Sequence, residues 1–132
     1  MIVLDTHVLL WLRSGSERLG GAARSEIERA WQAGEVCVSA ISFWEVALLK
    51  VKGRLEFPEE VALWRREQLE QGVIELAVDG EIGIRAASLP DVVADPADRL
   101  IVATALGGHV LVTADRRLVD WPGPLRRLDA AR

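Results

Sequence analysis

Four acidic residues lie far apart in the chain but at equivalent places in its predicted elements: Asp5, Glu45, Asp98 and Asp115. Asp5 ends one predicted strand and Asp115 follows another. Asp98 and Glu45 lie early in predicted helices. The carboxyl ends of parallel strands meet at one edge of a sheet, and ligands of open α/β sheets bind outside that edge. We therefore expect the four carboxylates to converge there.

A carboxylate cluster of this kind predicts a site for a divalent cation. Carboxylates held close together repel one another and raise their own pKa values unless a cation neutralises them. A set of oxygen ligands without histidine or cysteine favours Mg²⁺ or Mn²⁺ over Zn²⁺. Such ions promote hydrolysis of phosphodiester bonds, and this is the reaction that the four acids indicate.

Each acid taken alone also has a purely structural explanation. Asp5 and Asp115 could each cap a helix. Asp98 could complement a helix dipole, and Ser42 with Glu45 matches a capping box. Four acids at one sheet edge are harder to explain in this way. We therefore treat them together as metal ligands and catalytic residues.

Polar residues beside the acids are candidates for supporting roles. Thr6 and Thr113 could orient the acids through hydroxyl hydrogen bonds, although both could equally be turn residues. Arg99, Arg116 and Arg117 adjoin the acids and could hold the phosphates of a substrate, with a solvated helix charge as the alternative for at least one of them.

Two further residues near the acids receive structural assignments. Asp95 precedes Pro96 and is predicted to cap a helix, with assistance to the metal site as the alternative. His7 is expected at the rim of the site and not as a general base.

The acids can meet only if the surrounding elements form a parallel sheet. Apolar runs that read as strands alternate with segments that read as helices. The predicted strands are residues 2–5, 35–38, 73–78, 109–113 and 125–128. The predicted helices are residues 6–13, a segment through 22–31 that ends at Gly34, and residues 41–52, 59–71, 79–89, 95–106 and 115–119. This order predicts an α/β fold in three layers, with a mainly parallel central sheet flanked by helices.

Length and composition set limits on the class of protein. The 132 residues, 50% of them apolar, fit a single domain over 1–132. No apolar run approaches a membrane span and no secretion signal is evident, so we expect a cytoplasmic protein. The lone Cys37 excludes an intramolecular disulfide and is predicted to be a buried strand residue. Two bound divalent cations would offset the net charge of −4.

Four segments of the sequence together resemble the motifs of VapC-type PIN-domain toxins. The motifs occur in the expected order: VLDTHVLLW at residues 3–11, VSAISFWE at residues 38–45, DPADRLI at residues 95–101 and VTAD at residues 112–115. The resemblance implies a PIN-like fold and Mg²⁺-dependent endoribonuclease activity on an RNA substrate. It also implies a homodimer and neutralisation by a VapB-like antitoxin. It assigns the acidic metal-site positions to Asp5, Glu45, Asp98 and Asp115. The chain departs from the family pattern at Ala97, where a bulky aromatic is common, and at Val93 and Ala94.

Other classes of function remain as alternatives. A catalytically silent PIN-like binding scaffold would keep the fold without cleaving RNA. A phosphoacceptor signalling domain also gathers acids at a sheet edge, but both lysines here lie in one early helix, Lys50 and Lys52. A Rossmann dehydrogenase is excluded because no G-x-G-x-x-G follows a predicted strand.

The helix at residues 41–52 is apolar on nearly all sides, and one small core needs only one face of it. Neighbouring helices of the chain could cover the rest. Our hypothesis is that part of the helix surface, with Trp44 or Phe43 as anchor, receives the antitoxin beside the acids.

Overall fold

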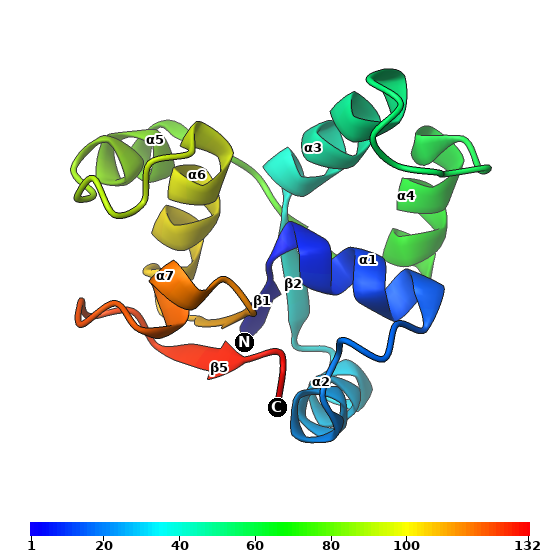
Figure 1. Cartoon of the computed structure of the whole chain (residues 1–132), viewed down its shortest axis with the longest axis horizontal. Coiled ribbons are helices and arrows are strands. Elements are labelled where there is room, and N and C mark those ends of the chain that lie inside the picture. Colours follow the sequence, from blue (N-terminus) through cyan, green and yellow to red (C-terminus); the bar gives the residue numbers. More distant parts are fainter.

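The computed structural model describes all 132 residues as an α/β fold of five strands and seven helices (Figure 1). The strands are β1 (Ile2–Leu4), β2 (Val36–Ser39), β3 (Ile74–Leu76), β4 (Val110–Thr113) and β5 (Arg127–Asp129). The helices are α1 (Thr6–Ser14), α2 (Gly21–Gln32), α3 (Ala40–Val51), α4 (Val61–Glu70), α5 (Gly80–Ala87), α6 (Pro96–Ala105) and α7 (Arg116–Val119). The predicted order of elements is confirmed, with ends that shift by a few residues.

The strands form one sheet in the order β3-β2-β1-β4-β5, and every pair of neighbours is parallel. The sheet is therefore wholly parallel, where the sequence indicated a mainly parallel one. β1 lies at its centre, between β2 and β4, so its carboxyl end is enclosed by strands on both sides. A residue that directly follows β1 is held at the middle of the sheet edge.

Two apolar cores cover the two faces of the sheet, because side chains alternate along each strand. Leu4 of β1 faces a core built with α1 to α4, whereas its neighbour Val3 faces a second core built largely with α6 and α7. Figure 1 shows the corresponding layers, with α1 to α4 on one side of the sheet and α5 to α7 on the other. Cys37 is a free, buried thiol on β2 in the second core, as the sequence predicted.

Aspartates begin three of the helices that border the carboxyl edge. Asp5 caps α1, Asp95 caps α6 and Asp115 caps α7, each accepting a hydrogen bond from a backbone N–H of the first turn. The capping role and the convergence at one edge are thus both present in the structure. The capping box suggested for Ser42 and Glu45 is absent, because α3 begins earlier and Ser39 is its cap.

Helix α3 presents its two aromatic residues in opposite environments. Phe43 is buried and packs edge-on against Trp64 of α4, with ring centroids 5.7 Å apart. Trp44 is 55% exposed. Phe43 therefore cannot anchor a second protein, and the hypothesis is wrong for that residue. The neighbouring helix α4 covers that side of α3.

The guanidinium group of Arg99 serves the fold and does not face the acids. It donates hydrogen bonds to backbone carbonyl oxygens that follow or end α5, namely those of Ala86, Ala87, Leu89, Pro90 and Val93. These bonds hold the segment between α5 and α6 against α6. The expectation that Arg99 binds substrate phosphate does not agree with this placement.

None of the helices combines the length and the apolar content that a membrane span requires.

The contrast between Phe43 and Trp44 predicts opposite effects on stability. Phe43→Ala removes a buried ring and leaves a cavity between α3 and α4. We therefore expect the free energy of unfolding to fall by about 3 to 5 kcal/mol. Trp44→Ala truncates an exposed side chain and should change it by about 0.5 kcal/mol or less. Chemical denaturation monitored by circular dichroism measures both. Equal losses in the two variants would contradict the packing described here.

Candidate active site

Asp5 lies at the centre of the candidate site. It directly follows β1 and is only 4% exposed. Its Oδ1 accepts a hydrogen bond from the backbone N–H of Thr6 at 2.8 Å, and its Oδ2 accepts one from the hydroxyl of Thr113 at 2.8 Å. The same Thr113 oxygen accepts from the backbone N–H of Asp115 at 3.1 Å. One buried hydroxyl thus fixes Asp5 relative to the start of the loop after β4.

Glu45 reaches the same edge from α3. The hydroxyl of Thr6 donates to Glu45 Oε1 at 2.5 Å and shares a hydrogen bond with the hydroxyl of Ser42 at 2.9 Å. Burial raises the pKa of Glu45, and the nearby charges of Asp5 and Asp95 raise it further against the opposing effect of the Thr6 hydrogen bond. Sequence reasoning considered Ser42 only as part of a capping box. Its real place is in this buried hydroxyl pair.

Asp98 lies in the first turn of α6, facing Glu45. One carboxylate oxygen from each of Glu45, Asp95 and Asp98 lies within 4.8 Å of the others. Burial, followed by the charges of the surrounding acids, raises the pKa of Asp98 from its ordinary value to about 7. The acids that contribute are Asp5, Asp95, Glu45 and Asp115. The carboxylates therefore act electrostatically as one cluster.

Asp95 belongs to this cluster as well as to the cap of α6. Its Oδ1 accepts hydrogen bonds from the backbone N–H groups of Ala97 at 2.9 Å and Asp98 at 3.1 Å. The sequence favoured the cap and kept the metal site as the alternative. The D-P-A-D spacing contains the signal for both, because a cap and a first-turn residue on the same helix end lie close together.

Asp115 differs from the other acids because a cation already accompanies it. Arg117 donates to its Oδ1 from Nε at 3.2 Å and to its Oδ2 from a terminal nitrogen at 3.0 Å. The side-chain hydrogen bond from Arg117 is the main reason that the pKa of Asp115 is lowered. Arg116 instead pairs with Asp129 of β5 and donates to the Ala114 carbonyl. Of the two arginines expected to contact phosphate here, Arg117 therefore lies beside the acidic cluster, and Arg116 does not.

His7 lies beside the site, but the lone pair of its Nε2 is already used in a hydrogen bond. Its Nε2 accepts a hydrogen bond from the backbone N–H of Ala114 at 2.9 Å, and its Nδ1 lies 3.7 Å from Asp5 Oδ2. With Nε2 as acceptor, a neutral ring carries its proton on Nδ1. The imidazole therefore points a positive dipole at Asp5.

The chemistry of these donors suits a hard divalent cation. The cluster offers carboxylate oxygens alone, which Mg²⁺ and Mn²⁺ prefer. Burial, together with the charges of the neighbouring acids, raises the pKa values of Glu45 and Asp98. A cation placed among them would relieve the repulsion.

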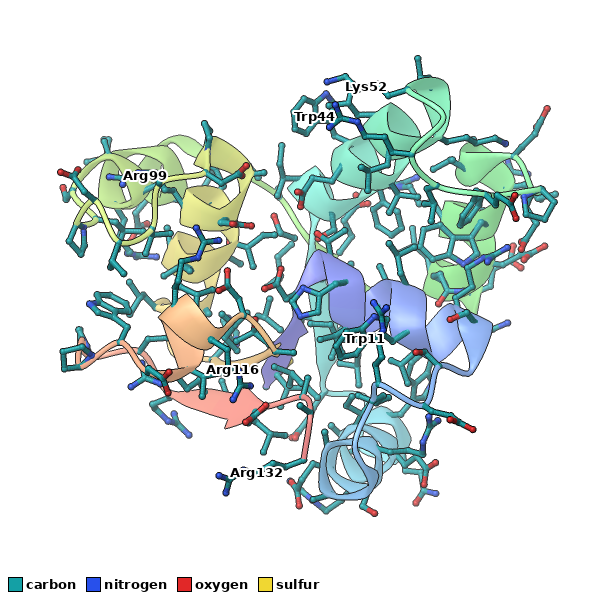
Figure 2. All side chains as sticks on the ribbon, viewed as in Figure 1. Trp11, Trp44, Lys52, Arg99, Arg116 and Arg132 are labelled. Atoms are coloured by element: carbon teal, nitrogen blue, oxygen red, sulfur yellow. The ribbon has the colours of Figure 1, made fainter.

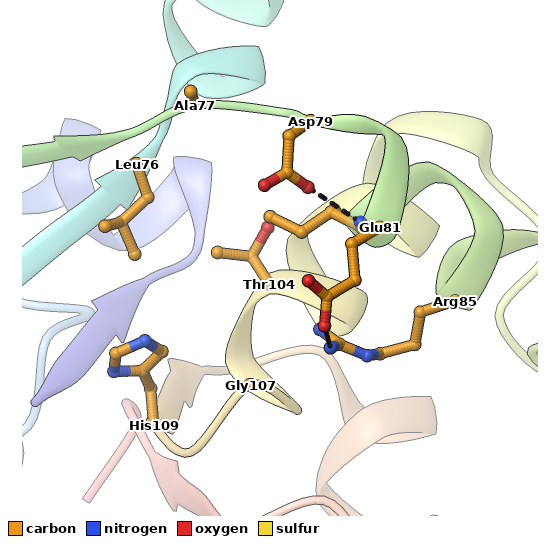
Figure 3. Close-up of a pocket in the computed structure, with 9 residues that line it drawn as sticks. Leu76, Ala77, Asp79, Glu81, Arg85, Thr104, Gly107 and His109 are labelled. Atoms are coloured by element: carbon orange, nitrogen blue, oxygen red, sulfur yellow. Dashed lines mark hydrogen bonds and ion pairs between the residues drawn. The ribbon is translucent and has the colours of Figure 1, made fainter.

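A separate pocket of about 340 Å³ lies beside α5, where Asp79, Arg85, Thr104 and His109 are among the lining residues (Figure 3). It shares no residue with the acidic cluster. Most of its polar groups are paired with the protein: Arg85 donates to Glu81 and to the Ala103 carbonyl, and Asp79 caps α5. His109 is the exception, since its Nδ1 is buried without a hydrogen-bond partner. The acids at the carboxyl edge therefore remain the candidate site.

Comparison with known proteins gives a consistent result. A family model described as PIN domain matches residues 2–123. Ribonuclease VapC22 of Mycobacterium tuberculosis is 40% identical over 119 residues, which cover 89% of this chain and 88% of that protein.

Two solved structures show the same fold. VapBC2 from Rickettsia felis, bound to a DNA fragment from its promoter, superposes with a TM-score of 0.70 at 14% identity over 98% of each chain. The DNA-bound VapBC from Salmonella typhimurium gives a TM-score of 0.68 at 20% identity, over 97% of this chain and 96% of that one. The match to the family model spans nearly the whole sequence, and the resemblance seen in the four motifs is confirmed. The chain belongs to the PIN-domain family.

Proposed function

We propose that this protein is an Mg²⁺- or Mn²⁺-dependent endoribonuclease of the VapC toxin type, which hydrolyses phosphodiester bonds of RNA. The observation that carries the proposal is the group of mutually repelling acids around Asp98, whose pKa rises to about 7. Such an arrangement opposes folding when no cation is bound, and costly arrangements of this kind cluster at functional sites. The 40% identity to a protein named as a ribonuclease supports the same activity.

In this proposal the acids share the work of holding the cation. Asp5, Glu45, Asp98 and Asp115 would bind it, and Asp95, whose carboxylate lies within 4.8 Å of those of Glu45 and Asp98, would assist them. The bound ion would lower the pKa of a water molecule and neutralise charge on the scissile phosphate. Thr6 and Thr113 keep Glu45 and Asp5 in fixed orientations through their hydroxyl hydrogen bonds.

Arg117 is placed to exchange partners when substrate binds. In the structure the two hydrogen bonds from its guanidinium group to Asp115 are made from an exposed position. If Asp115 turns its oxygens to a cation, the guanidinium is released beside the site and can hold a phosphate of the RNA in bidentate geometry. Arg116 and Arg99 have other partners and are not assigned this role.

The proposed protein partner is a VapB-like antitoxin. The two DNA-bound neighbours are VapBC assemblies. A basic side chain of the antitoxin, set among Asp5, Glu45 and Asp98, would compensate their charge in place of the cation.

A homodimer is also proposed, from the family resemblance. The exposed apolar side chains Ile74, Val78 and Ile84, on β3 and α5 and between them, offer surface for it. The proposed place of action is the cytoplasm, where RNA is available. A catalytically silent scaffold is disfavoured because all four acids of the family motifs are present.

Activity should depend on added divalent cation. In excess EDTA we expect cleavage of single-stranded RNA to stop, and Mg²⁺ or Mn²⁺ should restore it, because the donors are hard oxygens. Water is the proposed nucleophile, so the products should carry 5′-phosphate and 3′-hydroxyl ends. End-labelling and sequencing of the products test both points. Full cleavage in EDTA, or cyclic 2′,3′-phosphate ends, would contradict the mechanism.

Asp98→Asn should lose activity and gain metal-free stability. Its folded pKa of about 7 lies above its ordinary value, so the wild-type chain loses stability as pH rises between the two. In EDTA, the Tm of Asp98→Asn should therefore exceed that of wild type by a margin that grows from pH 4 to pH 8. With Mg²⁺ present, turnover should fall by orders of magnitude.

The control for this variant is Asp91→Asn, which removes an exposed carboxylate outside the cluster. Its Tm difference from wild type should stay constant with pH, and its turnover should stay normal. Glu45→Gln, Asp5→Asn and Asp115→Asn should each lose activity as Asp98→Asn does. A pH-independent Tm difference for Asp98→Asn would rule out the proposed charge repulsion at that residue.

A further inference from the structure

A small apolar pocket of about 190 Å³ borders the acidic cluster between α3 and the start of α6. Its walls are the side chains of two adjoining helical segments: Trp44, Glu45, Leu48, Leu49, Asp95, Pro96 and Ala97. Glu45 and Asp95 line this pocket and also supply oxygens to the candidate cation site. Whatever occupies the pocket therefore lies next to the bond that the proposed nuclease would cut.

The indole of Trp44 is the most unusual feature of the pocket. It stays 55% exposed although the chain buries its neighbour Phe43. Figure 2 shows Trp44 projecting from α3 on the side nearer α6. Leu48 follows it one helical turn later, so both side chains lie on the same face of α3. An exposed planar ring is thus set over an apolar floor at the edge of the acids.

We propose that this pocket binds one base of the RNA, stacked on Trp44, next to the phosphate that is cleaved. The inference rests on the proposed ribonuclease function and adds to it the position of a substrate nucleotide. Bases of single-stranded RNA bind proteins largely by stacking on aromatic rings. The base is uncharged, so it enters the apolar pocket without repulsion from Glu45 and Asp95. Its phosphate points toward the cation site, where a positive charge is available.

The dimensions of the pocket favour a single ring system over a larger ligand. Pockets that enclose drug-sized ligands measure about 300–1,000 Å³, so one of about 190 Å³ has room for a single ring system. The two acidic residues on its border also select against a phosphate or an acidic peptide in the pocket itself. Stacking on Trp44 needs only a planar ring, so any of the four bases can occupy the pocket.

The test measures coupling between Trp44 and one nucleotide of the substrate. Cleavage sites are first mapped with the wild-type protein and Mg²⁺ on single-stranded RNA oligonucleotides. An oligonucleotide that carries one site is then made with an abasic residue at each position flanking the cut bond. For wild type, removal of the base at one position should lower kcat/KM by about 5- to 100-fold. Trp44→Ala should cause a similar loss on intact RNA, and the abasic residue should then cause little further loss.

Matched variants separate stacking from general apolar contact. Trp44→Phe keeps a planar ring and should retain most of the activity. Trp44→Leu is apolar but not planar and should resemble Trp44→Ala. Leu63→Ala truncates another exposed apolar residue, on α4, and should leave kcat/KM unchanged. Circular dichroism melting checks that each variant is folded.

Three outcomes would overturn the inference. If Trp44→Ala cleaves intact RNA as well as wild type does, no base stacks there. If the fold-losses in kcat/KM from Trp44→Ala and from the abasic residue multiply when the two changes are combined, the indole and the base do not touch. Unchanged cleavage together with weakened antitoxin binding would assign the pocket to a protein contact. In each case wild-type cleavage shows that the proposed function stands, whereas wild-type protein that cuts no RNA with Mg²⁺ or Mn²⁺ removes both proposals.

Discussion

Repulsion among buried and half-buried carboxylates at one edge of the sheet is the constraint on which the rest of the site depends. Asp5 is held at the end of the central strand, and Glu45 and Asp98 approach it from helices on either side of the edge. Burial makes their charge costly, and the basic side chains at the edge, His7 beside Asp5 and Arg117 on Asp115, leave the pKa values of Glu45 and Asp98 raised. The free-energy cost of ionising Asp98 in these surroundings raises its pKa to about 7. A cation from solution is the simplest means of relieving it.

The chain holds these acids in place with groups that carry no charge of their own. The hydroxyls of Thr6 and Thr113 each hold one acid, and backbone N–H groups at helix starts hold others. Capping and metal binding are compatible uses of Asp95, because its cap engages Oδ1 alone, whereas Asp5 uses Oδ1 for the cap and Oδ2 for the hydroxyl of Thr113. Arg117 is the exception, since it engages both oxygens of Asp115. Arg117 lowers the pKa of Asp115, whereas the pKa of Asp98 is raised.

The fold and the meeting of the acids could be predicted from the sequence because both follow from local patterns. Alternating strands and helices imply a parallel sheet, and a residue that ends a strand must lie at its carboxyl edge. The directions of long side chains could not be predicted in this way. Arg99 turns to the carbonyls after α5, and Arg116 turns to β5, because of segments that approach them only in the folded chain. Phe43 and Trp44 are adjacent aromatic residues, and the packing of Phe43 into the core against Trp64 of α4 decides which of them is buried.

The most direct test of the account is to locate Mn²⁺ in the protein by anomalous X-ray scattering from crystals grown with that ion. The account predicts an anomalous peak among the carboxylates of Asp5, Glu45 and Asp98, within coordination distance of at least two of them, and its loss in Asp98→Asn. It also predicts that Arg117 loosens from Asp115 when the peak is present. Crystals that contain Mn²⁺ but show no peak at this cluster, or a peak only elsewhere, would contradict the central claim.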